Sequence, residues 1–448
     1  MTMKILASSL LSTILTASML SAEPIRLITL DPGHFHAALV QKIMPEGVDP
    51  VVNIYAPAGP ELDRHLALID GFNTRADHPT QWQTKVHTSP DFLAEMLRDH
   101  PGNVVVISGN NAKKARYILA CVKAGLNVLS DKPMAITPDD FAMVREAFRV
   151  AAEKKLILLD IMTERHEVST ELQREFSRFP GLFGELDKGT PDNPAVTKIS
   201  VHHFSKLVNG KPLQRPPWFY DPAQQGEAIV DVTTHLVDLV QWECFPEQVI
   251  APGDVQVLTA KKWNTPITLE QFKKTTQMDA WPDYLKPLVG ADNVLQTPAN
   301  GEFTYTLRGV NVKISVKWNF EPPAGTGDTH DSVLRGSKAA LHIRQGAEQS
   351  YKPVLYIEPT HADDAWLAAL NAAVAKLSER WPGLAVKESA GRWAVVIPEK
   401  FNIGHEAHFG QVAGDFLGYV QGKPVPAWEV PNILTKYNTL MEAWRMAR

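Results

Sequence analysis

The sequence predicts an α/β protein with two folded parts: a doubly wound parallel sheet, then an α+β domain with a large, mostly antiparallel open sheet. Up to residue 160, short apolar runs alternate with helical stretches, as in a parallel sheet covered on both faces. From residue 198, longer runs alternate apolar and polar residues, which is typical of strands with one packed face. The chain has 448 residues, a length that suits two or more domains.

In the first part, apolar runs predict strands and amphipathic stretches predict helices. The expected strands are residues 25–30, 51–55, 103–108, 127–130 and 156–160. The expected helices are residues 35–43, 113–124 and 138–153. This alternation predicts a first domain over residues 23–160.

In the second part, a different order of elements predicts a domain over residues 161–448. Alternating strands are expected at residues 198–204, 301–307, 311–318 and 339–343, with one strong helix at 226–242 between the first two. A strand at 353–357, a helix at 362–381 and a strand at 392–397 predict an inserted α/β unit at about 350–398. Helices at 409–420 and 431–447 close the chain.

Charge and the N-terminus limit the partners of this protein. A net charge of −5 gives no pull on phosphate backbones, so we expect no nucleic-acid partner. Residues 1–22 combine Lys4, a short uncharged run and small residues, which is the pattern of a signal peptide. No later stretch predicts a membrane anchor. We therefore expect an exported protein, periplasmic or extracellular, whose two cysteines, Cys121 and Cys244, are buried free thiols.

Residues 31–36 form the first segment that can carry chemistry, in the turn between the first strand and the first helix. A dinucleotide-binding domain places a pyrophosphate there, because the free N–H groups of a helix start favour anions. Only one of the usual three glycines is present, and the second strand ends at Tyr55 rather than at an acid for the ribose. The predicted cofactor contacts in this turn are Asp31, Gly33, His34, Phe35 and His36.

Two further segments offer proton-transfer groups. Lys132 follows a predicted strand, at the edge of the sheet where ligands bind. Asp231, His235 and Asp238 are spaced i, i+4, i+7 on the predicted helix, so a carboxylate one turn from the imidazole can orient it. Further predicted cofactor contacts at the sheet edge are Ser108, Asn110, Asp131 and Lys132.

Taken together, these segments resemble the glucose–fructose oxidoreductase and inositol dehydrogenase family (Gfo/Idh/MocA). Asp131-Lys132-Pro133 matches the Glu-Lys-Pro signature of that family with Asp for Glu. Gly226, Asp231 and His235 match its helix motif, with Glu227 in place of a second glycine, and Trp218, Asp221 and Pro222 precede that motif as in relatives. The resemblance covers most of residues 24–345.

The resemblance implies an N-terminal Rossmann domain and hydride transfer between NAD or NADP and a sugar or cyclitol. Lys132, Asp231 and His235 would then be the catalytic residues, with substrate contacts from Arg165, Trp218 and Asp238 and no metal ligand. The aromatic faces of Trp218, Phe219 and Tyr220 suit a carbohydrate ring. Nicotinamide cofactors are scarce outside the cytoplasm, so we expect tight cofactor binding. The open sheet also suggests a homo-oligomer.

Three other functions stay open on the sequence. The same family chemistry includes NAD-dependent glycoside cleavage, in which transient oxidation allows elimination of the glycosidic group. A sugar-binding relative without catalysis would explain the degenerate glycine turn. A metal-dependent hydrolase would use the histidine pairs at 34/36, 202/203 and 405/408, although none has the spacing of a zinc-protease helix.

Overall fold

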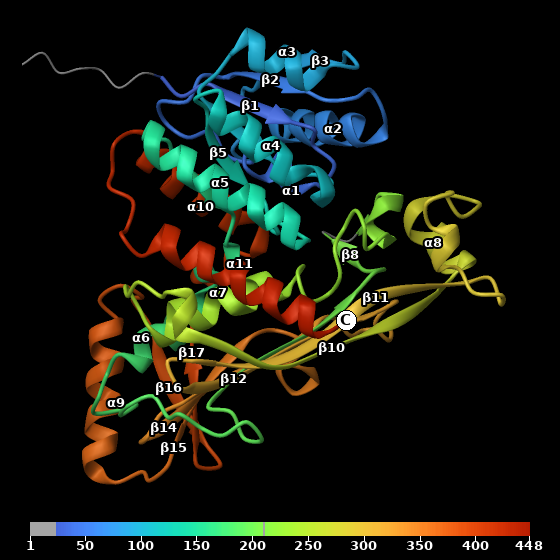
Figure 1. Cartoon of the computed structure of the whole chain (residues 1–448). Helices are drawn as coiled ribbons and strands as arrows, with labels where there is room; N and C mark the ends of the chain where they lie inside the picture. Colours follow the sequence, from blue (N-terminus) through green and yellow to red (C-terminus); the bar gives the residue numbers. More distant parts are fainter. Residues whose placement is uncertain (1–23, 209–210) are drawn as a thin grey trace, which may run out of the picture.

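The computed structural model describes residues 24–208 and 211–448, and it contains two sheets separated by helices. Figure 1 shows the smaller sheet at one end of the molecule and the larger sheet at the other. Between them lie α7 (Thr233–Cys244), α10 (His405–Val420) and α11 (Glu429–Met446). The predicted fold class is confirmed. The predicted signal peptide at residues 1–22 lies outside the described residues.

The first sheet is parallel and has the strand order β3-β2-β1-β4-β5-β6. Its strands are β1 (Leu27–Leu30), β2 (Val51–Tyr55), β3 (Gln83–His87), β4 (Val104–Ile107), β5 (Asn127–Ser130) and β6 (Leu158–Asp160). The helices of this domain are α1 (His36–Leu39), α2 (Pro60–Thr74), α3 (Phe92–Asp99), α4 (Asn111–Lys123) and α5 (Pro138–Lys154). This is the expected doubly wound sheet.

Three elements of this domain were absent from the sequence prediction. Strand β3 was missed because it is an edge strand of mostly exposed polar residues, with no apolar run to reveal it. Helices α2 and α3 were also not predicted. The first helix, expected over residues 35–43, is a single turn, α1.

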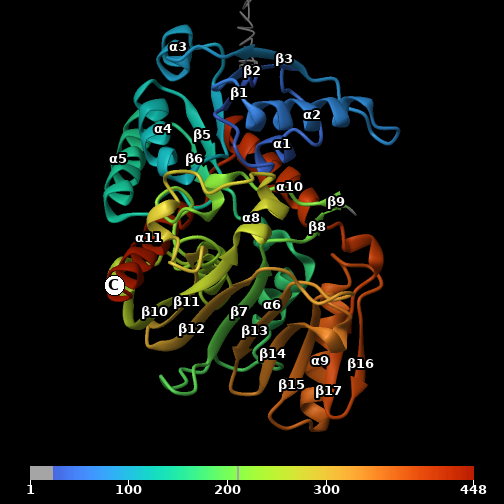
Figure 2. The ribbon, with the colours of Figure 1, turned by 90° about the vertical axis from the view of Figure 1, so that its right-hand side faces the viewer.

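The second sheet has nine strands in the order β10-β11-β12-β7-β13-β14-β15-β17-β16, which Figure 2 shows side by side. They are β7 (Val196–His203), β10 (Val255–Thr268), β11 (Val294–Leu307), β12 (Val310–Asn319), β13 (Thr329–Arg335), β14 (Ala339–Gln345), β15 (Val354–Pro359), β16 (Ala385–Ser389) and β17 (Arg392–Val396). All neighbours are antiparallel except β12 and β7. A separate hairpin pairs β8 (Leu207–Val208) with β9 (Lys211–Pro212).

The segment at about 350–398 contains the expected strand, helix and strand, and its strands join the large sheet. Strands β15 and β17 are antiparallel neighbours, and together with β16 they extend the nine-stranded sheet at one end. Helix α9 (Asp364–Leu377) connects them and buries one apolar face that includes Trp366 and Leu370. The remaining helices of this domain are α6 (Val168–Ser177) and α8 (Leu269–Thr276).

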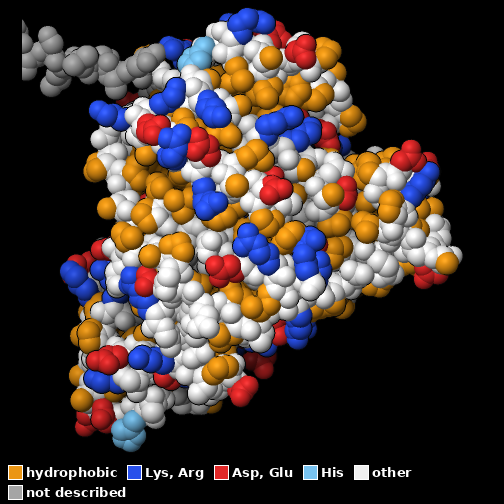
Figure 3. All heavy atoms as spheres, in the orientation of Figure 1, with side chains coloured by type: hydrophobic (Ala, Val, Ile, Leu, Met, Phe, Trp, Pro, Cys, Tyr) orange, Lys and Arg blue, Asp and Glu red, His pale blue; other side chains and the backbone are white. Residues whose placement is uncertain are grey.

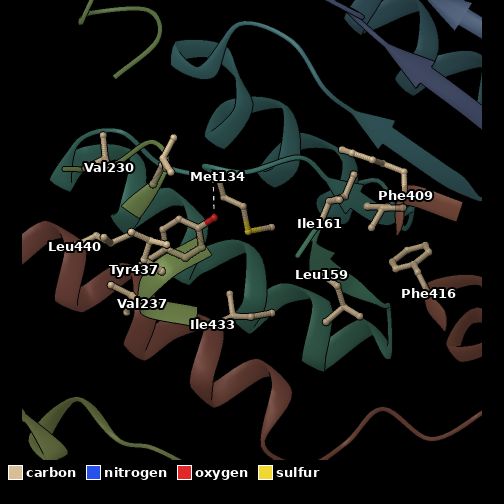
Figure 4. Packing of buried hydrophobic residues seen from close by; sticks show 14 of the residues in the cluster. Met134, Leu159, Ile161, Val230, Val237, Phe409, Phe416, Ile433, Tyr437 and Leu440 are labelled. Carbon is tan, nitrogen blue, oxygen red and sulfur yellow. Dashed lines mark hydrogen bonds between the residues drawn. The ribbon is translucent and has the colours of Figure 1, made fainter. Parts of the chain in front are cut away.

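The C-terminal helices return to the first domain and fix it against the second. Figure 4 shows Tyr437 of α11 among buried side chains of both domains, with its hydroxyl at Met134. The Met134 amide donates to this hydroxyl (2.9 Å), and the hydroxyl donates to Asp160 Oδ2 (3.0 Å). Lys436 Nζ lies 2.8 Å from Asp160 Oδ2 and 2.9 Å from Asp238 Oδ1. These contacts set the relative position of the two domains, and hence of the residues between them.

The surface is chemically mixed. On the face in Figure 3, side chains of both charges are interspersed with apolar ones. Within residues 24–208 and 211–448, no helix is both long and apolar enough to cross a bilayer. Cys121 is buried, Cys244 is half-buried, and both are free thiols.

Candidate active site

A cleft of about 1070 Å³ lies at the carboxyl ends of the parallel strands. His34, after β1, and Lys132, after β5, line one side of it. Ser200 on β7 and His330 on β13 line the opposite side, and His405 at the start of α10 also borders it. The strand order reverses between β1 and β4, and doubly wound sheets bind ligands at such a reversal.

Lys132 and Asp231 form an ion pair that links the two domains in this cleft. Lys132 Nζ lies 2.9 Å from Asp231 Oδ1, and both side chains are largely buried. Burial alone would raise the pKa of Asp231, but the Lys132 ammonium, with smaller contributions from Gln225 and His202, brings it below the usual value. Asp231 is therefore ionised at neutral pH and holds the lysine side chain in one place.

His235 lies in the first turn of α7 and lines the same cleft. Burial, followed by the positive charge of Lys132, lowers its pKa to about 3. The imidazole is consequently neutral at physiological pH. Its Nδ1 atom is buried without a hydrogen-bond partner in the described part of the protein, and no side chain of this part holds the ring by a hydrogen bond.

The predicted pairing of Asp231 with His235 is wrong. The expected helix over residues 226–242 begins only at Thr233: Gly226 has a φ of +94°, outside the right-handed helical region, and residues 228–232 form turns. Asp231 therefore precedes the helix, and its carboxylate meets Lys132 rather than the imidazole. The structure brings the three predicted catalytic residues to one cleft, with a different pairing among them.

The turn at residues 31–36 reaches the cleft only in its second half. His34, Phe35 and His36 line it, whereas the Asp31 carboxylate accepts hydrogen bonds from Lys113 Nζ (2.8 Å) and Tyr117 Oη (2.9 Å) of α4. Asp31 is thus occupied by side chains of its own domain.

Two glycines allow close packing at this turn. A Cβ on Gly109 would lie 2.3 Å from the Asp31 carbonyl oxygen. A Cβ on Gly33 would lie 3.3 Å from Trp218 Cζ2. The turn is therefore held against the loop after β4, with the Trp218 ring over it.

Not all of the predicted cofactor contacts after β4 and β5 line the cleft. Asp131 lines the cleft, and Ser108 Oγ donates to its Oδ2 atom (2.9 Å). Asn110 caps α4 by accepting from the Ala112 amide, and its side chain donates to Gln224 Oε1 (2.7 Å). Asn110 thus connects the two domains.

Arg165 and Asp238, predicted to bind substrate, do not line the cleft. The Arg165 guanidinium makes a bidentate pair with Asp238 (2.6 and 2.7 Å) and a second pair with Glu429 (2.9 Å). Lys436 completes the charge balance at Asp238. Because these charges are largely buried and paired with one another, the group holds elements together outside the cleft.

Trp218, the third predicted substrate contact, does line the cleft. Its ring packs on Gly33, and its Nε1 donates to Glu61 Oε1 (2.8 Å).

Glu164 is a cleft residue that the sequence did not suggest. It lies in the turn after β6, and His405 Nδ1 is 3.5 Å from its Oε1 atom. Burial would raise the pKa of Glu164, but His405 and, to a smaller extent, His235 and His330 together lower it below its usual value. The position of Glu164 after a strand of the parallel sheet could have been used to predict it as a cleft residue. Its contact with His405, 241 residues later in the chain, could not have been predicted from the sequence.

The cleft suits the nicotinamide end of a dinucleotide. His235 Nδ1 is a buried polar atom without a partner, and Asp131 and Lys132 border the same space. The adenosine end departs from the usual pattern, since β2 ends at Tyr55, whose ring stacks on His87. The fold and the cleft thus define an oxidoreductase with a nicotinamide-binding domain.

The comparisons with known proteins agree with this class. The model "Putative oxidoreductase C terminal domain" matches residues 172–448, and "Oxidoreductase family, NAD-binding Rossmann fold" matches residues 60–160. A crystal structure of a "putative oxidoreductase" from Parabacteroides merdae ATCC 43184 is 51% identical, with a TM-score of 0.92, covering 95% of this chain and 98% of that one. The chain belongs to the Gfo/Idh/MocA family of NAD(P)-dependent oxidoreductases.

More distant structures share the fold. A levoglucosan dehydrogenase in complex with NADH and levoglucosan is 13% identical, with a TM-score of 0.58, covering 94% of this chain and 97% of that one. A "putative myo-inositol dehydrogenase" from Sinorhizobium meliloti 1021 is 14% identical, with a TM-score of 0.53 and the same coverage. No curated protein matches the chain significantly.

Proposed function

We propose that this oxidoreductase acts on a hydroxyl group of a sugar or cyclitol. The observation that carries the proposal is the Lys132–Asp231 ion pair beside the neutral, unpartnered imidazole of His235, in a cleft at the edge of the Rossmann sheet. An ammonium and a free imidazole nitrogen side by side are what the oxidation of an alcohol requires of the protein.

The far wall of the cleft supports a substrate with several hydroxyl groups. Ser200, His202, His330 and Gln345 all line it from strands of the large sheet. Such side chains can both donate and accept, so they suit a ring whose hydroxyls do the same. The structural relatives that bind levoglucosan, or carry an inositol dehydrogenase name, point to the same class of compounds.

The residues divide the proton transfer between them. The Lys132 ammonium donates a hydrogen bond to the substrate hydroxyl and lowers the pKa of that hydroxyl, while Asp231 keeps the ammonium in place. The imidazole of His235, which lines the cleft, accepts the hydroxyl proton, and the Glu164 carboxylate offsets part of the charge that forms. Bound NAD(P) would supply the hydride acceptor, and Lys132 would lie beside its nicotinamide end.

The test is to incubate the purified protein with NAD or NADP and a panel of sugars, cyclitols and glycosides. Nicotinamide absorbance measures the reduction of the cofactor, and mass spectrometry identifies the product. Lys132→Met and His235→Ala should each lower kcat by about 10²–10⁴-fold. Lys261→Met, on edge strand β10, is the matched control and should keep the wild-type rate. Wild-type rates in both cleft variants, or no reduction with any polyol, would refute the proposal. Sugar release from a glycoside without net reduction would instead establish the glycosidase reaction.

We also propose that the protein is exported, holds its cofactor tightly and self-associates through the large sheet. Support for self-association comes from β10, a 14-residue edge strand with mostly exposed or half-exposed residues. N-terminal sequencing of the secreted protein, mass analysis of released nucleotide and light scattering test the three points. An N-terminus that still begins at residue 1 would contradict export with signal cleavage. A cofactor-free protein would contradict tight cofactor binding, and a monomer would contradict self-association.

A further inference from the structure

Three potential metal ligands meet at the cleft from two separate loops. His34 and His36 belong to the turn after β1, and Asp131 follows β5. His36 Nδ1 lies 3.0 Å and His34 Nδ1 4.0 Å from Asp131 Oδ2. Taking one ligand atom from each residue, all three atoms lie within 4.8 Å of one another.

These separations are close to those of ligands that share an ion. Two atoms bound to one tetrahedral ion at 2.0–2.1 Å lie about 3.3 Å apart. The distances of 3.0 and 4.0 Å lie on either side of this value, and an ion at His34 Nδ1 would replace the hydrogen bond that this atom accepts from the His36 amide (3.4 Å). Because all three residues also line the cleft, the remaining coordination positions are open to a ligand.

Hydrogen bonds from two neighbouring residues fix the orientation of the Asp131 carboxylate. Ser108 Oγ donates to Asp131 Oδ2 (2.9 Å), and the Lys132 amide donates to Asp131 Oδ1 (2.9 Å). Such outer contacts orient ligands in metalloproteins and contribute strongly to affinity.

We propose that His34, His36 and Asp131 bind one divalent transition-metal ion. Two imidazoles and a carboxylate favour Zn²⁺, Co²⁺ or Fe²⁺ over Mg²⁺ and Ca²⁺, which prefer oxygen ligands alone. With its open positions toward the cavity, the ion can bind neighbouring oxygen atoms of a substrate beside Lys132. The proposal does not rest on the proposed function, because binding is measured on the resting protein without substrate or turnover.

The test is calorimetric titration of the untagged, chelator-treated protein with Zn²⁺ and, separately, with Mg²⁺. We expect one Zn²⁺ per chain and much weaker Mg²⁺ binding. Loss of an outer contact costs about 10–100-fold in affinity, so Ser108→Ala should weaken Zn²⁺ binding by that factor. Loss of a direct ligand in His34→Ala, His36→Ala or Asp131→Asn should weaken it by more than about 100-fold.

His342→Ala is the matched control, because His342 pairs with Asp331 on the large sheet and does not belong to the three-residue cluster. It should keep the wild-type affinity. Thermal melts without metal show whether each variant is folded, and Co²⁺ absorption bands report coordination independently of heat. No stoichiometric Zn²⁺ binding, or equal affinity in the wild type and folded His34→Ala and His36→Ala variants, overturns the proposal.

Discussion

The ion pair between Lys132 and Asp231 allows a test in which a second substitution should recover stability but not activity. The two side chains are 13% and 9% exposed, and their charged atoms are 2.9 Å apart. Removing one partner of such a buried pair leaves the other charge uncompensated, at a cost of about 3–5 kcal/mol. Lys132→Met should therefore lower the free energy of unfolding by about that amount, and so should Asp231→Asn if the remaining ammonium stays buried.

The double variant Lys132→Met/Asp231→Asn carries neither charge. Its loss of stability should fall short of the sum of the single losses by at least about 2 kcal/mol, since residues in contact couple this strongly. Urea unfolding of the four proteins, with equal m-values, measures this coupling. Activity should behave differently, because no variant regains the ammonium at the substrate. Single losses that add within about 0.5 kcal/mol would refute the paired geometry.

Three further predictions concern groups outside the catalytic residues. Burial lowers the pKa of His65 to about 4. Between pH 6.5 and 4 the unfolded chain therefore binds more protons than the folded protein, and the free energy of unfolding decreases as the solution is made more acidic. Between pH 7 and 5, urea unfolding of His65→Phe should lose about 2 kcal/mol less than the wild type, and equal losses would contradict this. Lys198 and Glu243 are fully buried, and their charged atoms are 2.6 Å apart. Lys198→Met should therefore destabilise the protein by about 3–5 kcal/mol, and adding Glu243→Leu should restore much of this loss. No recovery of the urea midpoint in the double variant would argue against the pair. A Cβ on Gly109 would lie 2.3 Å from a backbone carbonyl oxygen, so Gly109→Ala should cost about 1–3 kcal/mol by melting or urea, whereas Gly71→Ala, with open space on α2, should be neutral or stabilising. Equal effects of the two glycine substitutions would show that this close approach does not exist.

Local pattern was enough for most of the first domain. Apolar runs such as residues 103–108 predict buried strands because only a strand covered on both faces needs so continuous a run. Strand β3 could not be found in this way, since four of its five residues are exposed at the sheet edge. In the second domain, antiparallel β15 and β17 had the same local pattern as a crossover unit, because periodicity does not report which neighbour a strand pairs with.

The sequence by itself determined that Lys132, Asp231 and His235 would meet, because strand ends of a doubly wound sheet converge at one edge and a family motif supplied the partner segment. Their pairing was decided by the tertiary structure, since Asp231 lies in the turns before α7 and its carboxylate meets a lysine 99 residues earlier in the chain. The fate of Arg165 and Asp238 was decided in the same way: charges on α7 and α11 pair only after these helices pack, and burial then commits them to each other. Spacing along the chain fixes which residues share an edge or a turn, whereas the contacts that neutralise a buried charge come from segments that only folding brings within reach.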